Sequence, residues 1–173
     1  ILLVPGIDID HADDAPDVMR GEETQIIGSQ AADADCLTVV APGSHTKWVR
    51  VEAGRIVGFK TYMSGEIFHA LSHHTILSAF MSAPDTRDDA AFQEGVGRFV
   101  NADGDRDLLA EAFSARTLPL MQRMRHEAVS DYLSGLVIGS EVRHALKRAA
   151  DGAILLVGSG DLAHRYASAI AAY

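Results

Sequence analysis

The stretch of residues 37–48 constrains the fold of this chain more than any other part of the sequence. It opens with an apolar, β-branched run that predicts a buried strand, and Pro42-Gly43 ends this run with a turn. Another tight turn, Ala53-Gly54, separates two further runs of strand-forming residues. Together these signals predict a three-strand meander over residues 37–41, 47–52 and 55–62.

The first turn of this meander has the composition of a phosphate-binding site. Glycine at Gly43 lets a ligand approach the backbone closely, and the N–H groups of a turn can form an anion-binding nest. Ser44 adds a hydroxyl, and Lys47 adds a positive charge that neutralises phosphate or merely orients the hairpin. An ordinary hairpin with a polar turn remains the alternative, because a short motif needs structural context.

Composition narrows the class of protein and its partners. The 173 residues suffice for a well-buried domain, and no apolar run reaches the roughly 20 residues of a membrane span. A net charge of −9 disfavours nucleic acid and anionic membranes as partners, but it permits a phosphorylated small molecule at a local site. The single cysteine, Cys36, excludes an internal disulfide and fits a reducing cytoplasm.

Helical and strand patterns alternate along the rest of the chain. A helix is predicted over about residues 21–32 and another over 64–73, and the pattern stays helical from 85 to 149. Residues 153–157 then predict a strand buried on both faces, followed by a helix over 161–172. This order predicts an α/β lobe with a mixed sheet and a helical insertion.

Acidic residues open the first predicted helix. A carboxylate at Glu22 or Glu23 stays ionised there, because the helix dipole and free N–H groups favour its charge. Such a carboxylate can accept a proton from an attacking hydroxyl, although glutamates at helix starts are also common without a function. Arg20 beside them can bind a carboxylate ligand through its planar fork, or form an ion pair with an aspartate of residues 13–17.

Two further patterns in the sequence are typical of ligand sites. Residues 158–163 read G-x-G-x-x-A between a strand and a helix, as in dinucleotide-binding turns, but that fingerprint needs a further strand and an acidic residue about 20 positions on. His69 and His73 have a spacing that can bind zinc, with His74 beside them, but the sequence marks no third ligand. No protein-bound metal site is therefore expected.

Five segments, taken in order, resemble the 2-dehydro-3-deoxygalactonokinases, sugar-acid kinases of the actin/hexokinase/Hsp70 superfamily. The combination of MRGEETQ at residues 19–25 with PGSHTKW at 42–48 is specific, and the resemblance covers nearly the whole chain. Where the family has threonine in the second motif, this chain carries Ser44. The five segments are residues 18–28, 37–48, 62–68, 133–141 and 154–161.

The resemblance implies ATP-dependent phosphorylation of the 6-hydroxyl of 2-dehydro-3-deoxy-D-galactonate, with Mg²⁺ bridging phosphates. Glu22 matches the family's catalytic base best, with Glu23 left open, and Arg20 is implied to bind the sugar acid. Two turns are implied to hold ATP: Gly43-Ser44 its phosphates, and Gly158, Ser159 and Gly160 its adenosine. A non-catalytic sugar or nucleotide sensor of the same superfamily, or a nicotinamide-dependent enzyme, is the alternative.

The same resemblance implies a ribonuclease H-like, actin-like lobe of a two-lobe kinase. Residues 1–33 would end the first lobe with a hinge-side helix, and 34–173 would form the second, nucleotide-binding lobe with an incomplete C-terminus. The superfamily's first phosphate hairpin, of the Asp-x-Gly-Thr type, is absent, since no second glycine and hydroxyl follow Asp8. The chain alone is therefore expected to be inactive and to associate into homo-oligomers through exposed apolar surface.

Overall fold

A computed structural model describes residues 5–10, 14–29, 35–81, 87–100, 106–149, 152–158 and 160–173. The contacts of the chain divide it into two compact units. The first comprises Ile1–Met63 and Arg148–Tyr166, and the second comprises Ser64–Lys147 and Ala167–Tyr173. The predicted division at residue 33 refers to the lobes of the whole protein and stays a prediction.

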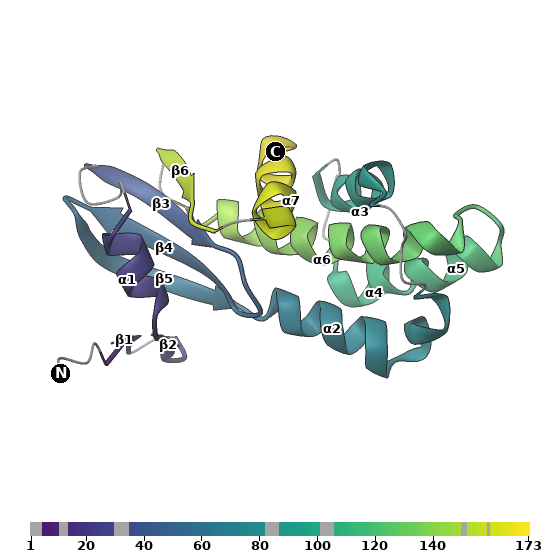
Figure 1. Cartoon of the computed structure of the whole chain (residues 1–173), viewed down its shortest axis with the longest axis horizontal. Helices are drawn as coiled ribbons and strands as arrows, with labels where there is room; N and C mark the ends of the chain where they lie inside the picture. Colours follow the sequence, from purple (N-terminus) through teal and green to yellow (C-terminus); the bar gives the residue numbers. More distant parts are fainter. Residues whose placement is uncertain are drawn as a thin grey trace. The chain divides into compact units, whose positions relative to one another are not determined.

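A four-stranded mixed sheet forms the body of the first unit (Figure 1). The strands β3 (Cys36–Ala41), β4 (Thr46–Glu52) and β5 (Arg55–Tyr62) pair antiparallel, which confirms the predicted meander. The strand β6 (Ala153–Leu156) pairs parallel with β3, in the order β5-β4-β3-β6. The prediction that β6 is buried on both faces was wrong: its side chains are half-buried or exposed, because it lies at the edge of this sheet.

One face of this sheet is covered by the helix α1 (Glu22–Ile27). Alternate residues of neighbouring strands share a face, so four side chains of β3 and β4 meet Ile26 of α1. The buried cluster consists of Met19, Ile26, Leu37, Val39, Val49 and Val51. The helix is shorter than predicted, since it ends at Gly28, a residue of low helix propensity.

A small antiparallel pair precedes α1 in the first unit. It joins β1 (Ile7–Ile9) to β2 (Asp17–Met19), with Ile7 opposite Met19. Gly6 just before β1 has a φ of +97°, and a Cβ built there would lie 2.5 Å from the carbonyl oxygen of Met19. Only glycine fits this close approach without strain.

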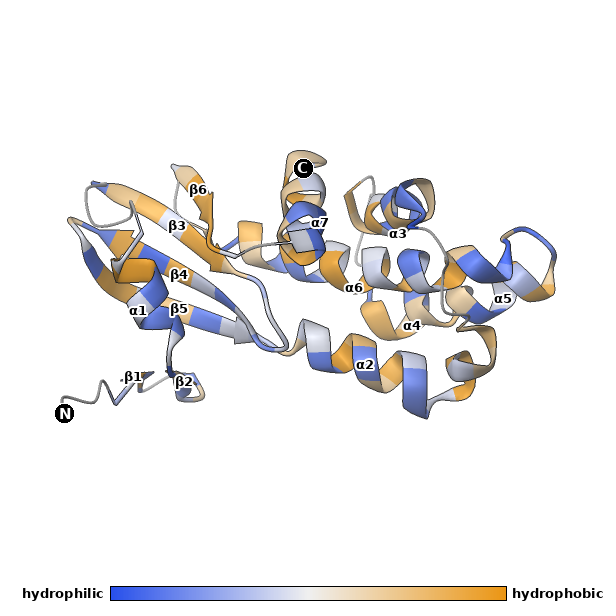
Figure 2. Cartoon of the chain, in the orientation of Figure 1, coloured by the Kyte–Doolittle hydropathy of each residue, from blue (hydrophilic) through white to orange (hydrophobic). Residues whose placement is uncertain are grey.

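The second unit is helical, as the pattern over residues 85–149 predicted (Figure 1). Its central helix α6 (Val129–Leu146) has 13 of 18 residues buried, although its ribbon in Figure 2 shows both apolar and polar residues. No helix in the described part of the chain combines the length and apolar composition that crossing a bilayer requires. The helices are α2 (Ser64–His74), the 3₁₀ helix η2 (Ile76–Phe80), α3 (Asp89–Val100), α4 (Leu108–Ala112), α5 (Ser114–Leu120), the 3₁₀ helix η3 (His126–Ala128), α6 (Val129–Leu146) and α7 (Gly160–Ala171), which spans the boundary of the two units.

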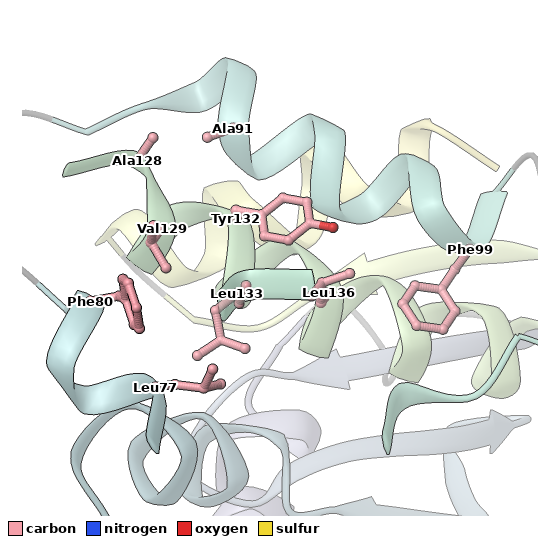
Figure 3. Close-up of a cluster of buried hydrophobic side chains, with 10 residues drawn as sticks. Leu77, Phe80, Ala91, Phe99, Ala128, Val129, Tyr132, Leu133 and Leu136 are labelled. Atoms are coloured by element: carbon pink, nitrogen blue, oxygen red, sulfur yellow. The ribbon is translucent and has the colours of Figure 1, made fainter. Parts of the chain in front are cut away.

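Side chains of α6, η2 and α3 build the core of this unit (Figure 3). Tyr132, Leu133 and Leu136 of α6 are fully buried, and the hydroxyl of Tyr132 lies 2.7 Å from that of Ser114. Burial raises the pKa of Tyr132 above its ordinary value, although the hydrogen bond between its hydroxyl and that of Ser114 opposes this. The tyrosine therefore stays neutral in the core.

Two glycines set how closely α3 and α6 pack. A Cβ on Gly135 of α6 would collide with the carbonyl oxygen of Phe92, and one on Gly95 of α3 would collide with that of Tyr132. These obstacles are backbone atoms, which move less readily than the ends of side chains. The absence of a side chain at both positions therefore lets the two helices touch.

Replacing Gly135 with alanine should lower the free energy of unfolding by about 1–3 kcal/mol, the usual cost of overpacking a core. Gly97→Ala is the matched control, because Gly97 lies in α3 with no atom within 4 Å of the added Cβ. That change should be neutral or stabilise by up to about 1 kcal/mol through helix propensity. Urea denaturation measures both, and equal effects would contradict the close packing of α3 and α6.

Candidate functional site

A pocket of about 360 Å³ lies in the first unit, where three separate segments meet. One segment is the start of α1, one is the turn between β3 and β4, and the third follows β6. The lining residues are Arg20, Gly21, Glu22, Gln25, Ala41, Pro42, Gly43, Ser44, His45, Val157 and Gly158.

The parallel pairing of β3 with β6 brings the two predicted nucleotide turns together. Val40 lies opposite Leu156, and the N–H of Val157 donates to the carbonyl oxygen of Val40 at 2.9 Å. The carboxyl ends of both strands therefore open at the same edge of the sheet, where ligands bind in α/β folds. A Cβ on Gly158 would lie 3.7 Å from Pro42, so these turns are neighbours in space.

The two glutamates at the start of α1 occupy different environments. Glu23 is only 5% exposed, and its Oε2 accepts a hydrogen bond from the N–H of Gly21 at 2.6 Å. Glu22 is half-buried and lines the pocket, while its Oε2 accepts from the N–H of Arg20 at 3.1 Å. Gly21 has a φ of +114°, which favours glycine at this bend.

Arg20 is exposed at the wall of the pocket. Among the described residues it forms no ion pair: Asp14 binds Lys60 at 3.0 Å, and Asp17 accepts hydrogen bonds from Thr61. Asp13, another partner considered from the sequence, lies outside the described residues. In the part of the chain that is described, the guanidinium is therefore available to a ligand.

Buried hydroxyl groups support the turn that carries Gly43 and Ser44. The hydroxyls of Thr46 and Tyr166 lie 2.8 Å apart in a buried hydrogen bond. The same Oγ1 of Thr46 lies 3.4 Å from the N–H of Gly43, at the limit of a hydrogen bond. Gly43 itself is open: a Cβ built there would meet nothing nearer than the backbone nitrogen of His45, at 4.0 Å.

Two of the predicted site residues, Lys47 and Gly160, lie outside the pocket lining. Lys47 of β4 is only 5% exposed and lies opposite Ala41, a pocket residue on the same face of the sheet. Gly160 begins α7 with a φ of +72°. Ser159 lies outside the described residues.

Sequence reasoning missed Gln25 and His45 as pocket residues. His45 stands between Ser44 and Thr46 within the PGSHTKW motif, so its neighbours could have indicated it. Gln25 follows Gly21 and Glu22 by one helical turn, and the period of the helix could have placed it on their face.

Comparison with known proteins agrees with this set of segments. A family model described as 2-keto-3-deoxy-galactonokinase matches residues 1–173. The 2-dehydro-3-deoxygalactonokinase of Escherichia coli (strain K12) is 38% identical over 173 residues, covering 99% of this chain and 57% of the relative. A protein of Rhizobium meliloti (strain 1021), named as a probable enzyme of this kind, is 41% identical over 161 residues, covering 90% of this chain and 51% of the relative.

A solved structure has the same fold. A crystal structure assigned to a 2-dehydro-3-deoxygalactonokinase of Sinorhizobium meliloti superposes with a TM-score of 0.87 at 36% identity. The match covers 96% of this chain and 56% of the other. The chain thus spans little more than half the length of each of these relatives.

The different environments of the two glutamates predict different effects on stability. Glu23→Ala should lower the free energy of unfolding by about 1–3 kcal/mol, because the N–H of Gly21 loses the charged acceptor of a part-buried hydrogen bond. Glu22→Ala serves as the control and should cost less than about 1 kcal/mol, since water can replace its carboxylate. Urea denaturation compares them, and a larger loss in Glu22→Ala would show that the roles are reversed.

Proposed function

We propose a phosphoryl transfer for the whole protein, because this chain belongs to the 2-keto-3-deoxy-galactonokinase family. The reaction moves the γ-phosphoryl group of ATP to the 6-hydroxyl of 2-dehydro-3-deoxy-D-galactonate. The observation that carries the proposal is the pocket in which an arginine and a glutamate face two glycine turns. The match to a kinase family over the full chain favours this reaction over a sensor or a nicotinamide enzyme.

In this proposal Glu22 is the general base for the sugar hydroxyl. Its carboxylate lines the pocket at the start of α1, and a carboxylate in such a position can accept the proton of a substrate hydroxyl. Burial and the hydrogen bond to Gly21 support a structural role for Glu23 instead. Arg20 would hold the carboxylate of the sugar acid through two parallel hydrogen bonds.

The two glycine turns would hold ATP. Gly43 and Ser44 would bind the β- and γ-phosphates through backbone N–H groups and the hydroxyl, and Gly158, Ser159 and Gly160 would lie against adenosine. Lys47 lies opposite Ala41, a residue of the pocket lining, which supports a role for its ammonium group in neutralising phosphate charge. Catalysis in such transfers consists mainly of positioning and charge neutralisation.

Magnesium would enter with the nucleotide in this scheme. Among the described residues no three His, Cys, Asp or Glu side chains gather into a metal site, and Glu22 is the one carboxylate in the pocket lining. A Mg²⁺ ion in a kinase is held by one or two carboxylates plus phosphates and water. Because Glu22 is assigned here as the base, the described pocket lining leaves no carboxylate for the metal.

The proposal extends to the architecture and location of the whole protein. The mixed sheet with helices supports assignment to the actin-like, ribonuclease H-like superfamily, with residues 1–33 ending a first lobe and 34–173 in the nucleotide-binding lobe. The cytoplasm fits a chain with a single cysteine. Homo-oligomers would form through apolar surface such as Leu109, which is 86% exposed, and Met121, which is 71% exposed.

Glu22→Gln in the full-length enzyme should lower kcat by roughly 10²–10⁴ with little change in the KM of the sugar acid, as expected on losing a general base. Glu127→Gln, at an exposed glutamate in the first turn of η3, is a matched control that should keep full activity. A coupled ATPase assay over a panel of 2-keto-3-deoxy acids measures both. Unchanged turnover in Glu22→Gln would refute the assignment of the base.

Ser44→Ala and Gly43→Ala should weaken ATP binding and leave sugar-acid binding intact. Within the chain a Cβ at Gly43 meets no atom nearer than 4.0 Å, so a loss of affinity would report the approach of the nucleotide. Gly58→Ala in β5 is the control, since it too adds a Cβ with nothing within 4 Å. Isothermal calorimetry that finds equal ATP affinity in all variants would make this turn purely structural.

A further inference from the structure

The carboxylate of Asp17 ties β2 to β5 within the first unit. Its Oδ2 accepts a hydrogen bond from the backbone N–H of Thr61 at 2.7 Å, and its Oδ1 accepts from the hydroxyl of the same threonine at 2.6 Å. Oδ1 also accepts from the N–H of Val18 at 2.8 Å. A carboxylate that receives two hydrogen bonds from one residue fixes both distance and orientation, and charge-assisted bonds of this kind are stronger than neutral ones.

This contact holds one end of the segment that lines the pocket. Asp17 lies three residues before Arg20, and Met19 between them is 3% exposed in the buried cluster under α1. The other end of the segment is held by Glu23, whose carboxylate accepts from the N–H of Gly21. Glu22, the proposed base, thus stands on a short stretch of backbone that is fixed on both sides.

A second link between the same two regions is weaker. Asp14 pairs with Lys60, the neighbour of Thr61, at 3.0 Å on the exposed surface. The hydrogen bond from Lys60 holds the pKa of Asp14 below its usual range, but exposed ion pairs contribute little to stability. Lys60 also contributes a flexible side chain, whereas Thr61 presents its backbone to Asp17.

We propose that Asp17 is a positioning residue for the phosphoryl transfer, acting through Thr61 to set where Arg20 and Glu22 stand in the pocket. The inference rests on the proposed function and adds to it a residue outside the described pocket lining. The glycine turns after β3 and β6 do not depend on this contact, since they are placed by the pairing of those two strands. Loss of Asp17 should therefore weaken the binding of the sugar acid and slow the transfer to its hydroxyl. It should leave ATP binding unchanged.

Asp17→Ala in the full-length enzyme should lower kcat on the order of 10- to 100-fold, as a displacement of about 1 Å does, and raise the KM of the sugar acid. The Kd of ATP should stay within about twofold of the unmodified enzyme, because its turns are held elsewhere. Asp17→Asn keeps one acceptor oxygen and should recover part of the activity. Thr61→Ser keeps both donors and should be nearly normal, and Asp14→Ala is the control that should change neither constant.

Hydrogen exchange gives a second measurement that needs no activity. In Asp17→Ala the amides of residues 18–23 and of Thr61 should exchange faster, whereas in Asp14→Ala they should not. Unchanged kcat with unchanged exchange would overturn the role of Asp17, and so would a parallel loss of ATP binding, which indicates general unfolding. If the unmodified enzyme does not phosphorylate the sugar acid, the proposed function fails, and the exchange of residues 18–23 alone then decides whether Asp17 positions the segment.

Discussion

Hydrogen bonds between the parallel strands β3 and β6 determine where the pocket lies. Their pairing in register, extended by the bond from the N–H of Val157 to the carbonyl oxygen of Val40, places two turns from opposite ends of the sequence at one edge of the sheet. The remaining segment of the pocket lining, the start of α1, lies at that same edge. It completes the pocket, because Ile26 packs α1 on the same sheet while Arg20, Glu22 and Gln25 line the pocket together with the β3–β4 turn.

Polar contacts support the segments that line the pocket in the first unit. The buried pair Thr46–Tyr166 supports the turn after β3, and Glu23 holds the bend before α1. Buried polar groups need such partners, since an unpaired donor or acceptor loses its bonds to water. In the second unit close packing has the same effect, because Gly135 lets α6 touch α3 at the level of the backbone. Both units are thus held by contacts that tolerate few substitutions.

Much of the secondary structure could be read from local signals. Pro42-Gly43 and Ala53-Gly54 delimited β3, β4 and β5 to within about one residue, because turn formation depends on residues that are adjacent in the chain. The errors occurred where tertiary context decides. An apolar run predicted full burial for β6, but burial depends on the number of neighbouring strands, and β6 lies at the edge of the sheet. Gly28 ended α1 earlier than the helical pattern suggested.

The sequence by itself determined the candidate residues and their local geometry: a glycine and a serine in a turn, and a glutamate at a helix start. It also determined the family, since the motifs of residues 19–25 and 42–48 follow one another in a specific order. Only the tertiary structure showed that Glu22 lines the pocket while Glu23 is buried, that Lys47 is buried opposite Ala41, and that Asp17 is bonded to Thr61. These features depend on the path of the chain between distant residues, which local propensities do not encode.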